Sequence, residues 1–157
     1  MRKTITRPIP HAHLPAEEDW LKLEDLVQVE VTSEEPTHPI ESALIPGTES
    51  GWQAAGPGEQ TIRLIFDDAH RITRIRLLFI EAEVERTQEF VLRWSADRGR
   101  SFHEIVRQQF NFSPSGATRE EEDFRVSLSG VTVLEMDLVP DKSGGEARAS
   151  LAKLQLA

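Results

Sequence analysis

The side chains of Arg86, Gln88, Asn111 and Phe112 combine three kinds of planar group within a short stretch of the chain. Guanidinium and amide groups donate and accept hydrogen bonds in fixed planes, and an aromatic face packs against the apolar side of a ring. This combination suits a ligand rich in hydroxyl groups. Each of the four lies at an end of an alternating apolar segment, so we expect them at loops that close one end of the fold.

Two other runs contain residue types found in metal or catalytic sites, but their surroundings do not favour such a site. The run His11-Ala12-His13 has a spacing known from metal sites, but it lies among prolines without a fixed third ligand. The run Asp67-Asp68-Ala69-His70 separates two alternating segments, where aspartates commonly form turns.

The sequence also lacks the local motifs of the common enzyme classes. It has no cysteine, no Gly-x-Ser-x-Gly elbow, no phosphate-binding glycine loop and no His-Glu-x-x-His helix. We therefore predict a binding protein that is not an enzyme and that uses no cofactor and no metal. An enzyme on the same scaffold is the least favoured alternative, because a fold by itself excludes no chemistry.

Charge and composition narrow the partners and the compartment. The net charge of −9 disfavours nucleic acid and anionic membranes, since both are bound through clustered Lys and Arg. The longest apolar run, Leu77-Leu78-Phe79-Ile80, is far too short to span a bilayer. Prolines 8 and 10 interrupt the region where a signal peptide would be apolar, and the absence of cysteine fits a reducing compartment. We expect a soluble, cytoplasmic protein with no nucleic-acid or membrane partner.

Most of the chain after Gly58 alternates apolar and polar residues with a period of two, which is typical of strands with one buried face. Clusters of Asp, Ser, Gly and Pro separate these segments, and no long helical pattern occurs. The pattern predicts an all-β, antiparallel jelly-roll β-sandwich of about eight strands. The parity of the strands predicts that five residues are buried: Leu64, Phe90, Leu92, Trp94 and Met136.

The chain divides into two parts at the first alternating segment, which begins at Val27. Residues 1–26 contain three prolines near their start and are expected to form an N-terminal arm that leads into the first strand through a short turn. Residues 27–157 form the predicted sandwich, which is long enough to bury a core without metals or disulfides.

Three short motifs resemble those of the discoidin, or coagulation-factor C-type, family of galactose-binding-like jelly rolls. They are Ser50-Gly51-Trp52 followed by the segment 60–66, the segment 90–102 with its Ser-x-Asp-x-Gly turn, and the closing segment 148–156. The resemblance covers about residues 27–157. It implies a module that binds carbohydrate, or in some members protein or lipid headgroups, through loops at one end of the sandwich.

The resemblance also implies a structural calcium in many members, held by a loop before the tryptophan and by the last strand. This sequence departs from that pattern, because the usual Asp does not follow Ala43-Leu44 and Lys153 brings a positive charge. Calcium takes six to eight oxygen ligands, of which Glu49 offers one carboxylate. We therefore expect that calcium is dispensable.

Two functions stay open from the sequence. The first is a carbohydrate-binding module with a site at Arg86, Gln88, Asn111 and Phe112. The second is a protein-interaction module or accessory subunit, in which acidic strand faces and the N-terminal arm dock another chain, or the arm covers a sheet edge. A concave polar pocket favours the sugar, whereas a flat apolar patch favours a protein.

Overall fold

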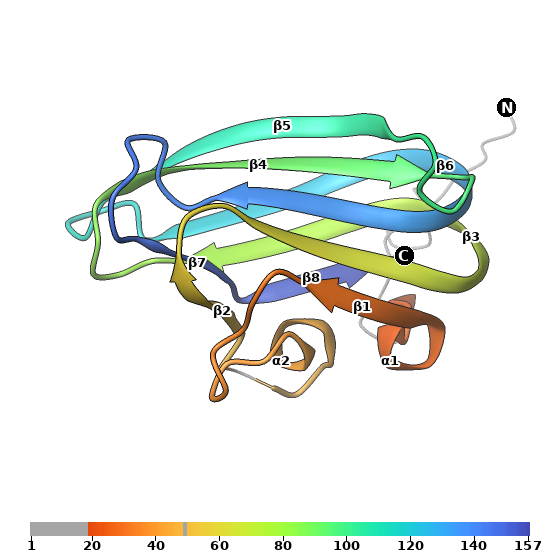
Figure 1. Cartoon of the computed structure of the whole chain (residues 1–157), viewed down its shortest axis with the longest axis horizontal. Helices are drawn as coiled ribbons and strands as arrows, with labels where there is room; N and C mark the ends of the chain where they lie inside the picture. The colour runs from red at the N-terminus through yellow and green to blue at the C-terminus, as the bar shows by residue number, and fades with distance from the viewer. Residues whose placement is uncertain (1–18, 49) are drawn as a thin grey trace, which may run out of the picture.

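The computed structural model describes residues 19–48 and 50–157, and antiparallel β-strands dominate this part of the chain (Figure 1). Two helices of one turn each, α1 (Leu23–Leu26) and α2 (Glu41–Leu44), lie near the N-terminal end. The eight strands are β1 (Val27–Val31), β2 (Trp52–Pro57), β3 (Gln60–Ile80), β4 (Arg86–Ser95), β5 (His103–Phe112), β6 (Arg119–Val139), β7 (Arg148–Leu151) and β8 (Lys153–Leu156). None of the described helices has the length and hydropathy of a membrane span.

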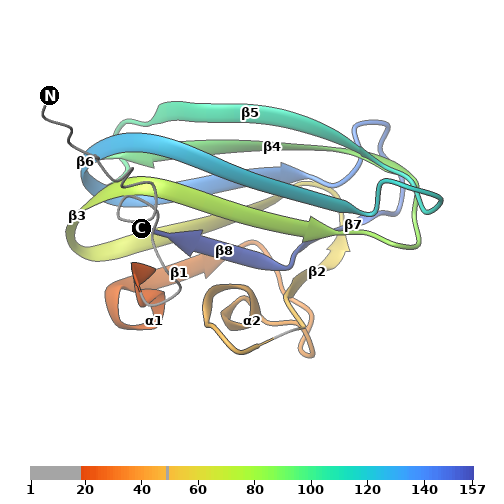
Figure 2. The same ribbon diagram turned by 180° about the vertical axis from the view of Figure 1, so that it is seen from behind.

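Strands β3 and β6 form one long antiparallel pair that folds over on itself. Their pairing runs from Gln60 opposite Leu138 to Ile80 opposite Arg119, with register shifts between residues 65 and 74. Figures 1 and 2 show both strands curving over at the same end of the molecule and running back as a second layer. Bulges permit such bends because they break the regular ladder and increase the local twist. Gly130 lies in the bend with a φ of 71°, a conformation that favours glycine.

The other strands attach to the two layers of this folded pair. In the first layer the order is β1-β3-β6-β4-β5, and in the second layer β8 pairs with residues 75–78 of β3. Strands β2 and β7 form a separate two-stranded sheet. The architecture confirms the predicted jelly-roll sandwich of eight antiparallel strands.

The residue types of Asp67-Asp68 and Ser129-Gly130 predict turns that separate strands, and this prediction was wrong. Both lie inside continuous strands, at the bends where β3 and β6 pass from one layer to the other. Turn-forming residues also suit a bend, so composition alone does not distinguish the two cases.

The core fills the space between the layers. Phe90 of β4 stacks on Phe79 of β3 with ring centroids 5.4 Å apart, and its edge meets Phe124 of β6. The predicted burial of Leu64, Phe90, Leu92 and Met136 is confirmed, since each is at most 1% exposed.

The predicted full burial of Trp94 was wrong, because its side chain is only partly buried. Trp94 lies one residue before the end of β4, where it pairs with His103 at the start of the edge strand β5. Its ring packs against the core on one side and lies 5.3 Å from the exposed imidazole of His103. Parity predicts the direction of a side chain, but burial also depends on how far the opposite layer extends.

Residues 19–26, the described portion of the segment expected to form the arm, pack against the sandwich. Leu23 is buried in the core, and the backbone N–H of Leu21 donates to the carbonyl of Leu156 at 2.8 Å. The guanidinium of Arg74 lies 4.9 Å from the centre of the Trp20 ring. Strand β8 and the second layer of β3 thus hold the start of the described chain.

The Ser-x-Asp-x-Gly turn after β4 closes the bend. The carboxylate of Asp97 accepts hydrogen bonds from the Ser95 and Ser101 hydroxyls, and the bonds from Ser101 and Ser95 lower the pKa of Asp97 well below its usual range. This turn presents Arg98, whose guanidinium donates to the carbonyls of Phe66 and Asp67 in the β3 bend.

The difference in burial between Phe90 and Trp94 predicts a difference in stability. Phe90→Ala should lower the free energy of unfolding by about 3–5 kcal/mol, because it opens a cavity in the packed core. Trp94→Ala should cost less, since the ring is partly exposed and its space fills with water. Urea denaturation of both variants measures the two values, and an equal or larger loss for Trp94→Ala would contradict this packing.

Candidate functional site

A polar hollow of about 380 Å³ lies at the end of the sandwich where β4 begins and β5 ends. The antiparallel register sets Arg86 opposite Phe112 and Thr87 opposite Asn111. The loop after β6 closes the hollow, since the N–H of Lys142 donates to the carbonyl of Thr87 at 2.8 Å. The lining residues are Glu85, Arg86, Thr87, Asn111, Phe112, Asp141 and Ser143. Three of the four residues proposed from the sequence therefore border one hollow.

Arg86 forms the floor of this hollow rather than a free positive charge. Its side chain is fully buried, and its Nε donates to a carboxylate oxygen of Glu81 at 2.8 Å. Its Nη1 donates to the Pro140 carbonyl at 2.8 Å and to Oε1 of Gln88 at 3.1 Å. A buried charge is tolerated only when such partners replace water. The guanidinium is thus fixed in position and neutralised by Glu81.

Phe112 and Gln88 support the floor from below. Phe112 is 1% exposed, and one face of its ring carries the Arg86 guanidinium at 4.7 Å from the ring centre. Gln88 is fully buried beneath the hollow and donates from Nε2 to Glu120 at 3.1 Å. The structure therefore gives no exposed aromatic face at Phe112 and no direct access to Gln88.

The accessible groups of the hollow are hydroxyls, one amide and carboxylates. The Asn111 side chain is exposed, and its Oδ1 accepts from the Thr87 hydroxyl at 2.8 Å, which leaves the amide N–H groups free to donate outward. The start of β4 and the end of β5 thus place the Thr87 hydroxyl beside the Asn111 amide. Glu85, the residue before β4, adds an exposed carboxylate.

The loop after β6 supplies an acceptor at the same hollow. Partial burial raises the pKa of Asp141, but hydrogen bonds from the hydroxyl and N–H of Ser143, a backbone hydrogen bond from Thr87 and the charge of Arg86 together lower it. The carboxylate is therefore ionised at neutral pH. The residues Asp141-Lys142-Ser143-Gly144-Gly145 predict a turn, but nothing in the sequence shows that this loop folds back onto Thr87.

A buried carboxyl group lies behind the floor. Burial, together with the hydrogen bond and the charge of Glu122, raises the pKa of Glu120 to about 8. Glu120 therefore keeps its proton at neutral pH. In the described chain its Oε1 accepts from Gln88, whereas Oε2 has no partner.

The loop that would hold calcium in the resembling family does not fit that ion here. The hydroxyl of Thr48 lies 2.8 Å from the carbonyl oxygen of Ser42 and 2.7 Å from that of Ile45, so it engages two of the oxygens a cation would use. Lys153 borders the same small hollow. The described residues contain no group of three or more side chains able to hold a metal, while Glu49, His11 and His13 lie outside the described residues.

The comparisons with known proteins establish the fold. No family model matches the sequence, and the search of the curated proteins finds no match. A CBM32 domain from a family 31 glycoside hydrolase of Clostridium perfringens is 19% identical with a TM-score of 0.65, over 88% of this chain and 94% of that domain. The CBM32 domain of AlyQ, in complex with 4,5-unsaturated mannuronic acid, is 16% identical with a TM-score of 0.62, over 85% and 95%.

A third structure belongs to the same group. The family 32 carbohydrate-binding module of C. perfringens NanJ, in complex with galactose, is 14% identical with a TM-score of 0.60, over 87% of this chain and 96% of that one. At these identities the likeness defines the class of fold. The chain has the β-sandwich fold of these CBM32 domains.

The raised pKa of Glu120 predicts a pH-dependent stability. The unfolded chain releases this proton near its ordinary pKa and the folded chain only near 8, so the contribution is full at acidic pH and is lost as pH rises to about 8. Glu120→Gln should therefore stabilise the protein by about 2–4 kcal/mol at pH 8.5 and by much less at pH 5. Urea unfolding at both pH values measures the difference. Glu121→Gln, at an exposed residue paired with Arg76, is the control and should bring no gain at pH 8.5.

The poor fit of the loop to calcium predicts that chelation has no effect. The melting temperature should be the same in EDTA as in millimolar calcium, because the Thr48 hydroxyl and apolar packing hold the loop. Differential scanning fluorimetry measures both conditions. A rise of several degrees with calcium, reversed by EDTA, would contradict the account.

Proposed function

We propose that this chain is a non-catalytic carbohydrate-binding module and that its ligand site is the polar hollow at the β4–β5 end. The observation that carries the proposal is the convergence of the Asn111 amide, the hydroxyls of Thr87 and Ser143 and the Asp141 carboxylate around one hollow. A volume of about 380 Å³ falls within the range of small-molecule sites. Neighbouring hydroxyls of a sugar both donate and accept, and this set offers both functions.

The rigid floor supports the same function. Arg86 is held by Glu81, Gln88 and the Pro140 carbonyl, so the hollow keeps its shape without a ligand. In a preformed site, less conformational entropy of the side chains is lost when a ligand binds. The roles of Gln88 and Phe112 are then to position Arg86 and the strand ends, while Asn111 contacts the sugar.

The charges of the hollow favour a neutral sugar over a uronic acid. Arg86 forms an ion pair with Glu81, whereas neither Glu85 nor Asp141 forms an ion pair within the described residues. A sugar carboxylate would meet like charges, which raises the cost of binding. The proposed ligand thus differs from the 4,5-unsaturated mannuronic acid in the complex of the AlyQ domain.

The chemistry of the same residues supports binding without bond cleavage. The Ser143 hydroxyl donates to Asp141 at 2.8 Å, but a carboxylate with a lowered pKa is a weak general base. No histidine lines the hollow. The likeness to carbohydrate-binding modules supports this choice, because those neighbours include a complex with galactose.

The proposal predicts weak, selective binding. An open site on a small sandwich buries little area, so we expect a dissociation constant of about 0.1–1 mM for the best neutral sugar and weaker binding of the matching uronic acid. Isothermal titration with galactose, its disaccharides and galacturonate measures these values.

One isosteric variant isolates the site. Asn111→Asp removes the two amide donors and adds a negative charge, so it should weaken neutral-sugar binding at least tenfold while the melting temperature stays within about 2 °C. Gln28→Glu adds the same charge at an exposed position on β1 and should bind like the parent. Equal affinities for the two variants would refute the assignment of the hollow.

A further inference from the structure

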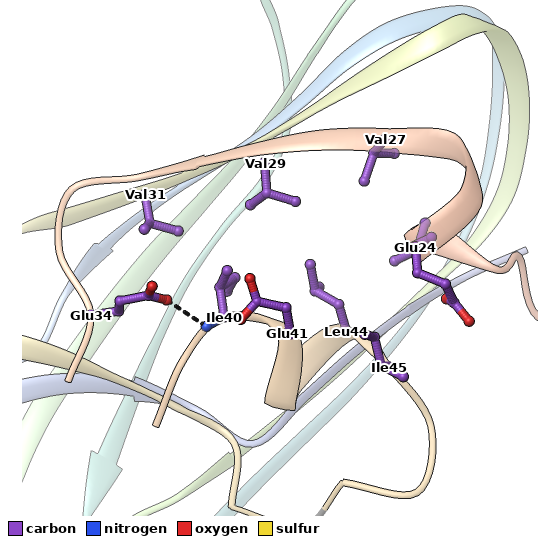
Figure 3. Close-up of a pocket in the computed structure, with 10 residues that line it drawn as sticks. Glu24, Val27, Val29, Val31, Glu34, Ile40, Glu41, Leu44 and Ile45 are labelled. Atoms are coloured by element: carbon purple, nitrogen blue, oxygen red, sulfur yellow. Dashed lines mark hydrogen bonds between the residues drawn. The ribbon is translucent and has the colours of Figure 1, made fainter. Parts of the chain in front are cut away.

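A second hollow of about 350 Å³ lies between β1 and α2, and unlike the polar hollow it is lined mainly by aliphatic side chains. Figure 3 shows Val27, Val29 and Val31 pointing from β1 toward Ile40 and Leu44 on the opposite wall. The lining contains no aromatic, amide or hydroxyl side chain, so it does not suit a sugar ring. We call this hollow the valine groove.

The valine groove is an open edge of the hydrophobic core. Val27, Val29 and Val31 pair with Phe66, Leu64 and Ile62 of β3, which are all buried, so the three valines share the inward face of the first layer. They nevertheless stay partly exposed. Strand β1 is also the edge of its layer. Partly covered apolar side chains on an edge strand favour association with another extended segment.

Carboxylates surround this apolar floor. Glu24 lies at one end of the groove, Glu34 at the other and Glu41 on the wall between them (Figure 3). All three are exposed, and none forms an ion pair within the described part of the chain. Glu34 accepts a hydrogen bond from the N–H of Ile40 at 2.8 Å, which fixes that end. The groove therefore selects a segment that is apolar in its middle and basic at its ends.

We propose that residues 2–7 of this same chain occupy the valine groove. Their sequence is Arg2-Lys3-Thr4-Ile5-Thr6-Arg7, with Pro8 next. In an extended segment, alternate side chains share one face, so Lys3, Ile5 and Arg7 face the same way. Ile5 then contacts the valines, and the two basic residues approach the carboxylates at the ends.

The dimensions agree with this placement. Lys3 and Arg7 are four residues apart, about 13 Å in an extended chain, which equals the span from Val27 to Val31. The described chain starts at Asp19, and α1, which borders the groove through Leu23 and Glu24, begins four residues later. The eleven residues between Arg7 and Asp19 can extend about 36 Å, so the segment has enough length to return to the groove.

Occupation of the groove would close the open edge of the sandwich. The segment would cover apolar side chains that are otherwise partly solvated, and its charges would pair with Glu24, Glu34 and Glu41. This inference does not rest on carbohydrate binding, because the groove and the polar hollow share no lining residue.

A spin label tests the placement, since a chain without cysteine accepts a single introduced one. In full-length Thr6→Cys carrying a nitroxide, methyl signals of the groove, including those of Val27, Val29, Val31 and Leu44, should be strongly broadened, whereas those of Val106 on the opposite edge strand β5 should not. Adding Ile5→Asp should abolish this broadening. Adding Thr4→Asp, which introduces the same charge on the opposite face, should keep most of it, and 0.5 M salt should reduce it.

A mixing experiment distinguishes a segment of the same chain from that of a second copy. Mixing isotope-labelled protein without a nitroxide and unlabelled, spin-labelled protein should give no broadening at the groove. Broadening in that mixture would mean that a second copy supplies the segment, and it would overturn the intramolecular proposal. Equal broadening in the Ile5→Asp and Thr4→Asp variants, or none at the groove methyls of the parent, would overturn it as well.

Discussion

The antiparallel pairing of β3 with β6 is the constraint on which the rest of the structure depends. The two strands are hydrogen-bonded from Gln60 to Ile80 and fold over together, so one pair contributes to both layers of the sandwich. Strands β1, β4 and β8 then add to its edges, and the core forms between the folded halves. The turn at Asp97 holds the bend, because it directs Arg98 onto the carbonyls of Phe66 and Asp67. The most specific motif of the sequence thus serves the fold rather than a ligand.

This arrangement also explains how the proposed site combines a rigid floor with an accessible rim. Arg86 and Gln88 share the inward parity of Phe90, so their polar groups are buried and must bind one another, Glu81 and Glu120. Thr87 and Asn111 have the opposite parity and reach solvent side by side. The hydrogen bonds among these buried groups make the cluster stiff, although Nη2 of Arg86 and Oε2 of Glu120 have no hydrogen-bond partner within the described chain. The loop at Asp141 gains its position from the backbone bond to Thr87.

The sequence predicted the architecture, and three of the four residues that it proposes as a ligand site border the polar hollow. The sequence failed to predict burial where this depends on partners distant in the chain. Period-two alternation was sufficient for the strands and for the burial of Leu64, Phe90, Leu92 and Met136. It did not reveal that Asp67-Asp68 lies in a bend or that Trp94 lies where the core ends. Residues 86, 88, 90 and 92 share one face of strand β4, so the inward direction of Phe90 and Leu92 predicts that Arg86 and Gln88 also point inward. The contribution of Asp141 depends on a loop contact that no local pattern encodes.

The most direct test of the carbohydrate-binding proposal is a chemical-shift map of the polar hollow during titration with a neutral sugar. Asn111 is the single asparagine of the chain, and its side-chain amide faces the proposed ligand. The account predicts that this amide and the backbone N–H of Ser143 shift saturably at millimolar sugar, while the signals of Val27 to Val31 stay in place. Shifts that cluster away from the hollow, or no shift of the Asn111 amide at millimolar concentration, would contradict the account.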